Sequence, residues 1–192
     1  MTRDEYQKAL ENLVKEGYRM TWISAHEFGG QPRYASIYEK KPGPLWRVQS
    51  GITATDLQNL IDELAKDGMQ PVHLYGYARG GAANFAAIFE QSSDPARIVK
   101  YDVPRDEFQK VSDDYFKQGY WRKGISGYFV GQTESWAGMW EKRSGSFAGR
   151  SNLTLERYLS ISESFSKQGY RMILLTAFAA PGGPKFNTSW EK

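Results

Sequence analysis

The residues best suited to chemistry stand in a column that follows four recurring glycines. Seven positions after each glycine stands a hydroxyl residue, and the two-residue alternation of a strand places aromatic rings and both histidines on the same face. Hydroxyls orient a ligand and rings give it flat contact, so this face suits a peptide, a cell-wall fragment or another polar small ligand. The predicted ligand-binding residues are Trp22, Ser24, His26, His73, Tyr75, Tyr77, Arg79, Ser126, Tyr128 and Thr176.

The two histidines open a second interpretation, in which the same cleft belongs to an enzyme. His26 and His73 replace other residue types at their positions in the column, and imidazole exchanges protons near neutral pH. Under this alternative, both histidines are candidates for acid–base catalysis together with nearby tyrosines. No carboxylate stands at a fixed spacing to orient either ring, which argues against it. A third interpretation is a structural or interaction array, whose column side chains satisfy one another's hydrogen bonds in a core.

The elements that carry this column repeat along the chain. The recurring glycines are Gly17, Gly68, Gly119 and Gly169, spaced by 51, 51 and 50 residues. Recurrence at a fixed period is typical of repeat proteins, so we expect one repeat domain over residues 1–192. The repeats run approximately over residues 2–51, 52–102, 103–152 and 153–192.

Each repeat reads as a helix followed by a β-hairpin. Apolar residues at helical spacing precede each glycine, as in Leu57, Leu60, Ile61 and Leu64. The glycine at the end of each helix suits a left-handed cap. After it the hydrophobic pattern changes to a period of two residues, and a glycine-rich turn separates two predicted strands. The segments that follow are expected to add a short third strand. The predicted fold class is α+β, with helices outside a curved antiparallel sheet that is open, half-open or closed into a barrel.

The two faces of the second strand differ in size, and this predicts where the helices lie. Ala35 and Ile37 represent a small face, whereas Tyr34 and Tyr38 represent an aromatic face. Because small residues let a helix approach a sheet closely, we place the helices on the small face. The helix of one repeat is then expected to cover the preceding hairpin, which leaves the last hairpin, with Asn187, as a polar cap.

A glutamate recurs at the end of each hairpin. Four such carboxylates could gather a cation, but basic residues recur nearby, so ion pairs are the expected arrangement. We predict neither a metal nor a cofactor. The glutamates are Glu39, Glu90, Glu141 and Glu191, and their expected partners are Arg19, Lys123 and Arg171.

Composition excludes several classes of protein and site. The chain has 192 residues, 40% hydrophobic and 24% charged, as in folded domains, and the absence of cysteine excludes disulfides and thiol chemistry. A net charge of +3 argues against nucleic acid as a partner, and no apolar run approaches the roughly 20 residues of a membrane span. No signal-peptide core follows Met1, so a cytoplasmic location is expected, or secretion if a signal was removed. The sequence does not define an oligomeric state.

The repeat resembles a known family through segments in its first and third copies. The carriers are Gly17-Tyr18-Arg19, Arg33–Glu39, Gly119-Tyr120, Ser126-Gly127-Tyr128 and Trp136–Glu141. Together they resemble the bacterial tandem repeat domain, which also forms the N-terminal part of polyglycine hydrolase-like proteins. In those proteins the resemblance implies a separate serine-hydrolase domain of β-lactamase type with a Ser-x-x-Lys motif.

The chain contains one Ser-x-x-Lys string, Ser164 to Lys167. The repeat register places Ser164 on the polar outer face of a helix, and Lys167 is the lysine that recurs before each glycine. No further motifs of the hydrolase domain follow. The resemblance therefore implies the accessory repeat module rather than an enzyme.

Overall fold

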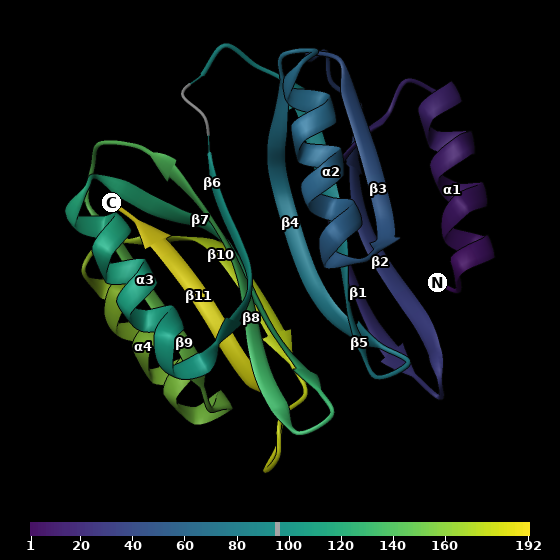
Figure 1. The fold of residues 1–192 in the computed structure, drawn as a ribbon. Coiled ribbons are helices and arrows are strands. Elements are labelled where there is room, and N and C mark those ends of the chain that lie inside the picture. Colours follow the sequence, from purple (N-terminus) through teal and green to yellow (C-terminus); the bar gives the residue numbers. More distant parts are fainter. Residues whose placement is uncertain (95–96) are drawn as a thin grey trace. The chain divides into compact units, whose positions relative to one another are not determined.

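Helices and strands follow one another in a repeating order. The computed structural model of the chain describes residues 1–94 and 97–192. Within these residues, four helices and eleven strands form the four repeats (Figure 1). Their bounds are α1 Arg3–Lys15, β1 Arg19–Phe28, β2 Gln31–Glu39, β3 Trp46–Ile52, α2 Ala54–Ala65, β4 Met69–Arg79, β5 Ala82–Gln91, β6 Ile98–Pro104, α3 Arg105–Lys117, β7 Tyr120–Val130, β8 Thr133–Lys142, β9 Phe147–Leu153, α4 Leu155–Lys167, β10 Arg171–Phe178 and β11 Lys185–Glu191.

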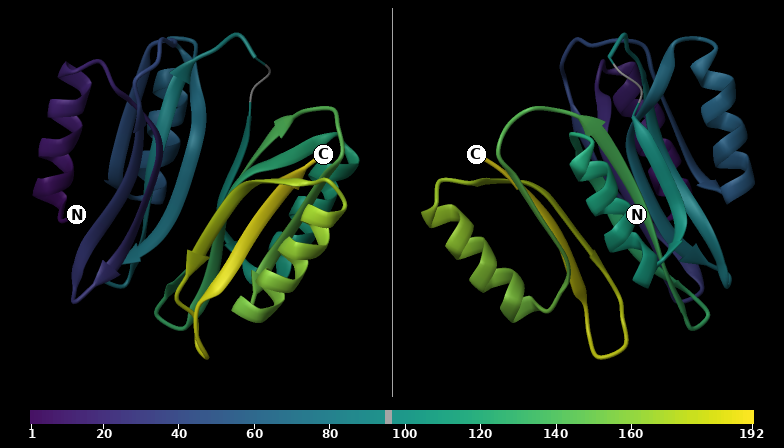
Figure 2. Two further views of the ribbon diagram at one scale, coloured as in Figure 1. Left: turned by 180° about the vertical axis from the view of Figure 1, so that it is seen from behind. Right: turned by 60° about the vertical axis from the view of Figure 1, so that its left-hand side comes forward.

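The chain divides into two compact units of two repeats each. The first unit comprises Met1–Arg97 with Val130–Gln132, and the second comprises Ile98–Phe129 with Thr133–Lys192. In each unit every helix lies against one face of a small sheet (Figure 2). The prediction of one domain over residues 1–192 rested on the repeat alone and stays a prediction.

Each helix ends at the recurring glycine, and three of the four begin at a threonine cap. The hydroxyl of Thr2 accepts a hydrogen bond from the N–H of Glu5, whose carboxylate accepts one from the N–H of Thr2, which forms a capping box. After α1, Gly17 has a φ of 84°, a left-handed conformation that favours glycine. The same holds for Gly68, Gly119 and Gly169, with φ of 70°, 81° and 82°, which confirms the predicted caps.

Each hairpin takes its third strand from the segment that precedes its own helix. The strand β5 pairs antiparallel with β4 on one side and with β3 on the other. The orders β6-β8-β7 and β9-β11-β10 repeat this arrangement, which confirms the predicted third strand and assigns it to the sheet of the following hairpin. The first sheet has only β1 and β2, although Met1 exchanges two backbone hydrogen bonds with Tyr34 at the edge of β2.

The described strands form four separate antiparallel sheets, so the closed-barrel form of the predicted fold does not occur. A barrel needs continuous strand-to-strand hydrogen bonding around its circumference. Here the ladder stops at β1, β4, β7 and β10, each of which is an edge strand of its sheet. Helices and small antiparallel sheets otherwise follow the predicted α+β order.

The aromatic face of each hairpin packs against the helix of its own repeat, which is opposite to the prediction. The rings of Tyr6 in α1 and Tyr34 in β2 stack with centroids 4.8 Å apart, and Phe108 in α3 lies 5.4 Å from Trp136 in β8. Large rings fill the wide space between a helix and a sheet, whereas the small opposite face admits a neighbouring sheet. The expectation that each helix covers the preceding hairpin is therefore also wrong.

In the first unit, the edge of β1 meets the small face of β4 and β5. The Nε2 atom of His73 lies 2.6 Å from the carbonyl oxygen of Ile23 and 3.4 Å from its nitrogen. On one side of this contact the ring of Trp22 lies 5.9 Å from that of His73, and on the other Ile23 packs with Ala86 and Ile88. We call this arrangement the edge-to-face joint.

The second unit contains an equivalent edge-to-face joint. The hydroxyl of Thr176 in β10 donates a hydrogen bond of 2.8 Å to the carbonyl oxygen of Ile125 in β7. Asn187 behind it is fully buried and donates to the Thr176 hydroxyl, so the polar hairpin β10–β11 lies inside the joint. The prediction of this hairpin as a polar cap on the array is therefore wrong.

Candidate functional site

The predicted ligand-binding column belongs in large part to the core of the two units. Both edge-to-face joints described above are made by its members, and most of it is shielded from solvent. Its role in ligand binding stays a prediction. His73, Tyr75, Tyr77, Ser126, Tyr128 and Thr176 are buried, Trp22, Ser24 and Arg79 are half-buried, and His26 is exposed.

The environment of His73 differs from that of a general acid or base. Its Nε2 atom contacts the backbone of Ile23, and its side chain is 9% exposed. Burial lowers the pKa of His73 to about 4, and the hydrogen bond to Ile23 opposes this shift only in part. The ring is therefore neutral at pH 7, as suits a side chain that pairs a strand edge.

Tyrosines of the column also form internal contacts. The Tyr77 hydroxyl lies 3.5 Å from that of Tyr34, and burial is the largest cause that raises the pKa of Tyr77. In the second unit, Tyr128 donates to the Asp102 carboxylate at 2.8 Å and accepts from the Asp102 N–H. These hydroxyls remain protonated at neutral pH and serve as hydrogen-bonding groups.

The recurring glutamates form ion pairs, as predicted. Arg19 lies 2.8 Å from Glu90 of the next repeat, and Arg19 is 5% exposed. Glu141 pairs with Lys123 at 3.5 Å, and Glu191 pairs with Arg171. No group of three His, Asp or Glu side chains suited to a metal occurs in the described part of the chain.

The Ser-x-x-Lys string lacks a catalytic arrangement. The exposed Ser164 accepts a hydrogen bond from the Gln168 amide, and the Lys167 ammonium pairs with Glu163 at 2.7 Å. A serine nucleophile needs its base within hydrogen-bonding reach. Here the lysine pairs with another side chain on the outer face of α4.

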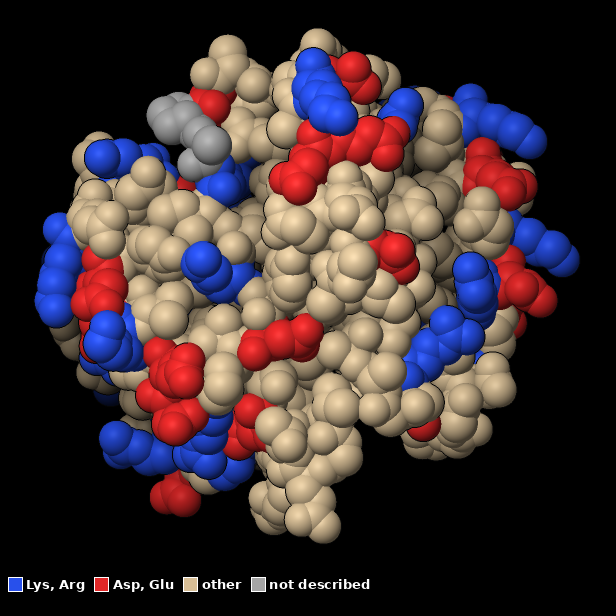
Figure 3. All heavy atoms as spheres, in the orientation of Figure 1, with Lys and Arg blue, Asp and Glu red and all other residues tan. Residues whose placement is uncertain are grey.

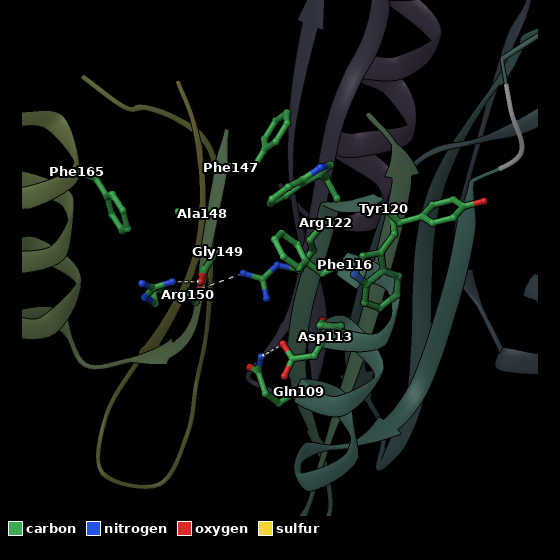
Figure 4. A pocket seen from close by; sticks show the side chains of 13 residues that line it. Gln109, Asp113, Phe116, Tyr120, Arg122, Phe147, Ala148, Gly149, Arg150 and Phe165 are labelled. Atoms are coloured by element: carbon green, nitrogen blue, oxygen red, sulfur yellow. Dashed lines mark hydrogen bonds between the residues drawn. The ribbon is translucent and has the colours of Figure 1, made fainter. Parts of the chain in front are cut away.

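A groove in the second unit offers a better candidate site. It encloses about 370 Å³ between α3, β7, β9 and α4 (Figure 4). Six aromatic side chains line it together with two arginines, which is the composition expected for a site that binds a flat anionic ligand. These residues are Phe116, Tyr120, Trp121, Trp140, Phe147 and Phe165 with Arg122 and Arg150.

Arg122 is the central charged group of this groove. Its guanidinium reaches from β7 to β9 and β11, and donates to the Ser151 hydroxyl at 2.7 Å and to the carbonyl oxygens of Arg150 and Thr188 at 3.3 and 3.0 Å (Figure 4). None of the described carboxylates forms an ion pair with it. Burial lowers the pKa of Arg122 to about 10, and the charge of Arg150 acts in the same direction, so the group is a cation at pH 7.

Two buried polar atoms of groove residues, one of them in the cation itself, have no hydrogen-bond partner in the described structure. They are the Nε of Arg122 and the hydroxyl oxygen of Ser112, a groove residue on α3. Buried polar groups are ordinarily paired, and a charged group that is not neutralised is destabilising. An anion in the groove would neutralise the guanidinium.

The repeat register shows that Arg122 departs from the pattern. Three residues after the glycine, the first and fourth repeats have Met20 and Met172, whereas the third has Arg122. Gly149 on β9 makes room for it, since a Cβ there would lie 2.7 Å from its Nη2 atom. Sequence reasoning missed this site because it compared the repeats mainly within the hydroxyl column. The substitution of an arginine for a core methionine was the available signal.

The groove has an apolar counterpart in the first unit. Leu10, Val14, Trp46 and Val48 line a groove of about 560 Å³ at the equivalent place between α1 and β3. Glu11, Lys15 and Arg47 also line the first groove, so the groove itself is a product of the repeat, and what is specific to the second unit is Arg122 at a position occupied by Met20 in the first. The repeat alone accounts for the groove, but it does not account for the arginine at its centre.

Charge elsewhere is mixed in sign. Acidic and basic side chains are interspersed on the face drawn in Figure 3, with no continuous basic stripe there. None of the helices in the described part of the chain is long and apolar enough to cross a membrane. The predictions about nucleic acid, membrane and other partners stay predictions.

Comparison with known families identifies the repeat. A search of curated proteins finds no match to the chain. A sequence model of the family described as polyglycine hydrolase-like, structural repeat, matches residues 1–41, 43–92, 94–143 and 144–192. From the second match onward, each matched segment begins just before the third strand of a sheet. These starting points lie about nine residues before those of the repeats expected from the sequence. In the structure, each match from the second onward contains a strand, a helix and a hairpin in that order. Because four consecutive matches span the chain, it belongs to the polyglycine hydrolase-like structural repeat family.

Proposed function

We propose that this chain is a non-catalytic repeat module that binds a carboxylate-bearing ligand, such as a peptide C-terminus, in the groove of the second unit. The observation that carries the proposal is the unneutralised guanidinium of Arg122 at a position that is methionine in two other repeats. A core methionine is replaced by a cation at a cost in desolvation, which a bound anion would offset.

The chemistry of the lining supports this class of ligand. Arginine is suited to carboxylate because its planar fork donates parallel hydrogen bonds. Arg150, whose guanidinium lies 5.4 Å from the ring of Phe165, adds a second positive charge, while Asp113 accepts from Gln109 at 2.8 Å. The groove therefore has more positive than negative charge close to its aromatic walls.

The aromatic walls support a ligand with a flat or apolar body. Trp121 lies between Phe116 and Phe147, with a centroid separation of 4.4 Å to each. Rings arranged in this way present both faces and edges to a ligand. A peptide that ends in an aromatic residue combines such a body with a terminal carboxylate.

A calorimetric titration with acetyl-Gly-Phe and its C-terminal amide tests the proposal. We expect the free acid to bind at least about tenfold more tightly than the amide, since one charged hydrogen-bonding interaction is worth 1.4 kcal/mol or more. Arg122→Met should abolish this preference. It should leave the free energy of unfolding within about 1 kcal/mol, because methionine occupies the equivalent place in other repeats.

The matched control is Arg105→Met. Arg105 is an exposed arginine at the start of α3 that lies 3.4 Å from Glu134, outside the groove. This variant should bind the free acid like the original protein. Equal binding of acid and amide, or unchanged binding by Arg122→Met, would contradict the proposal.

The acid–base alternative has weaker support. His73 is engaged with the backbone of Ile23, and its pKa of about 4 makes it a poor proton donor or acceptor at neutral pH. Binding in the groove does not require either histidine. His26→Ala should therefore bind acetyl-Gly-Phe normally.

A further inference from the structure

The edge-to-face joint has two halves, and each half recurs at a fixed place in the repeat. One half is the first strand of a hairpin, which presents an aliphatic residue six positions after the glycine. Ile23 and Ile125 occupy this place, and they are 0% and 1% exposed because the next repeat in the same unit covers them. We call this half the donor edge.

The other half is the small face of the following hairpin. In the first unit it includes Ala86 and Ile88, both 0% exposed. In the second unit the equivalent residues are Asn187 and Ser189, which are 0% and 4% exposed. We call this half the acceptor face.

The fourth repeat carries a donor edge that is exposed. Leu175 of β10 holds the place of Ile23 and Ile125, yet it is 41% exposed, and the adjacent Ile173 is 37% exposed. The strand β10 is an edge strand of its sheet, as β1 and β7 are. An open strand edge with apolar side chains is a surface that other chains can bind.

The first repeat carries an acceptor face that is exposed. Ile37, at the place of Ile88, is 53% exposed, and Ala35, at the place of Ala86, is also exposed. These two residues lie opposite Trp22 and Ser24 in the register of β1 and β2, so all four share this face. The chain therefore displays both halves of a joint that it assembles internally.

We propose that the donor edge of β10 in one copy of the chain docks on the acceptor face of β1 and β2 in a second copy. The continuity of these surfaces with the internal joints argues for a second copy rather than an unrelated partner. Ser24 stands at the place of Thr176, so its hydroxyl donates to the carbonyl oxygen of Leu175 as Thr176 donates to that of Ile125. Ile37 covers the apolar part of the edge.

This contact is heterologous, since it joins different surfaces of the two copies. Each copy in a singly linked pair still has one free half, so assembly continues until the contacts close into a ring of two or more copies, or extends as an open chain. Neither surface includes a residue that lines the groove of the second unit. The assembly and the proposed ligand binding can therefore fail independently.

Sedimentation velocity at increasing protein concentration tests the assembly. The original protein should pass from 21.9 kDa monomers to dimers or larger species. Ile37→Lys should block the acceptor face, and Leu175→Lys should block the donor edge. Each variant alone should remain a monomer, because a charge on an apolar contact opposes docking.

An equimolar mixture of the two variants provides the sharpest outcome. Ile37→Lys retains its donor edge and Leu175→Lys retains its acceptor face, so the mixture should form a one-to-one dimer and nothing larger. Leu159→Lys is the matched control, because Leu159 is an aliphatic residue of α4 that is 56% exposed outside both surfaces. It should assemble like the original protein.

Two results would overturn the proposal. One is an original protein that stays monomeric at every concentration. The other is assembly that survives in Ile37→Lys and Leu175→Lys at the level of Leu159→Lys. Circular dichroism of all three variants should match the original protein, since each substitution lies at an exposed position.

Discussion

At the scale of single residues, two charged or titratable groups that depart from the repeat lie in different environments. His73 is neutral and completes a strand edge, whereas Arg122 is a cation held among backbone carbonyls. The first satisfies the backbone of Ile23 and so belongs to the architecture. The second has no ion-pair partner among the described carboxylates, which is the basis of the proposed anion binding.

The burial of His73 predicts a pH dependence of stability. An unfolded histidine titrates near 6.5, whereas burial lowers the pKa of His73 to about 4 in the folded protein. The unfolded state therefore binds the proton first as pH falls. The contribution of His73 to the free energy of unfolding should be full above pH 6.5. It should fall by up to about 3 kcal/mol towards pH 4, at 1.36 kcal/mol per pH unit.

Urea denaturation at pH 7.0, 5.5 and 4.5 measures this loss. His73→Gln retains a neutral hydrogen-bonding side chain without a titrating proton, so its stability should fall less over the same range. The difference between the two profiles isolates His73 from carboxylates common to both proteins. Parallel profiles would show that His73 does not contribute the pH dependence.

At the scale of elements, the helix and the hairpin of one repeat are joined by interlocking rings. In the third repeat Phe108 of α3 lies 5.6 Å from Trp140 of β8, and Tyr115 lies 5.2 Å from the same ring. Trp140 is only 1% exposed. Small residues between the rings give them this space.

Gly138 shows how little free space remains at this interface. A Cβ at Gly138 would lie 2.4 Å from the ring of Trp140 and 3.0 Å from that of Phe108. Gly138→Ala should therefore lower the free energy of unfolding by about 1–3 kcal/mol through overpacking. Thermal unfolding followed by circular dichroism measures the change.

Gly149→Ala is the control for this prediction. Its Cβ would also make a close contact, at 2.7 Å, but with the end of the flexible Arg122 side chain. A shift of this long side chain would loosen its hydrogen bonds to Arg150 and Thr188, whereas the packed rings beside Gly138 have no room to shift, so the loss should be smaller than for Gly138→Ala. Equal losses in the two variants would indicate that a general preference against alanine in these strands, and not ring packing, determines the result.

Much of this element structure could be predicted from sequence, for identifiable reasons. Helical spacing and the glycine caps located α2 and its equivalents, because both signals are local. The parity of Tyr34 and Ala35 showed that they lie on opposite faces, but parity does not show which face a helix covers. That choice depends on whether rings fill a helix-to-sheet space or a joint between sheets, which is a tertiary property.

The candidate site was less predictable than the fold. The hydroxyl column recurs in every repeat, and its symmetry directed attention to residues such as Tyr75 and Thr176 that are buried in the structure. The groove combines β7 with β9 of the following repeat, so its lining is distant in sequence. Only the exchange of methionine for Arg122 was visible in the repeat register.

At the scale of the whole molecule, the strand that begins each repeat determines where the chain can be divided without breaking a sheet. Each three-stranded sheet is complete when it includes the strand before its helix. The strand β6 pairs with β8 from Ile98 opposite Trp140 to Pro104 opposite Ser135. A fragment that begins after β6 loses this pairing.

Two fragments of the second unit test the frame. Residues 94–192 retain β6, whereas residues 105–192 lack it and expose the edge of β8. The longer fragment should unfold at a clearly higher urea concentration, since the shorter one loses a strand and its backbone hydrogen bonds. Equal denaturation midpoints would contradict the assignment of β6 to this sheet.

The edge-to-face joint also affects how such sequences can diverge. In one joint an imidazole reaches the strand edge, and in the other a hydroxyl does so from a place two residues further along its strand. Because a single side chain, and not a hydrogen-bond ladder, makes the polar contact, joint residues can change without altering the register of either sheet. Substitutions at the joints therefore leave the pairing within each sheet unchanged. Individual repeats can acquire new surface residues, as the third has with Arg122, while each sheet keeps its fold.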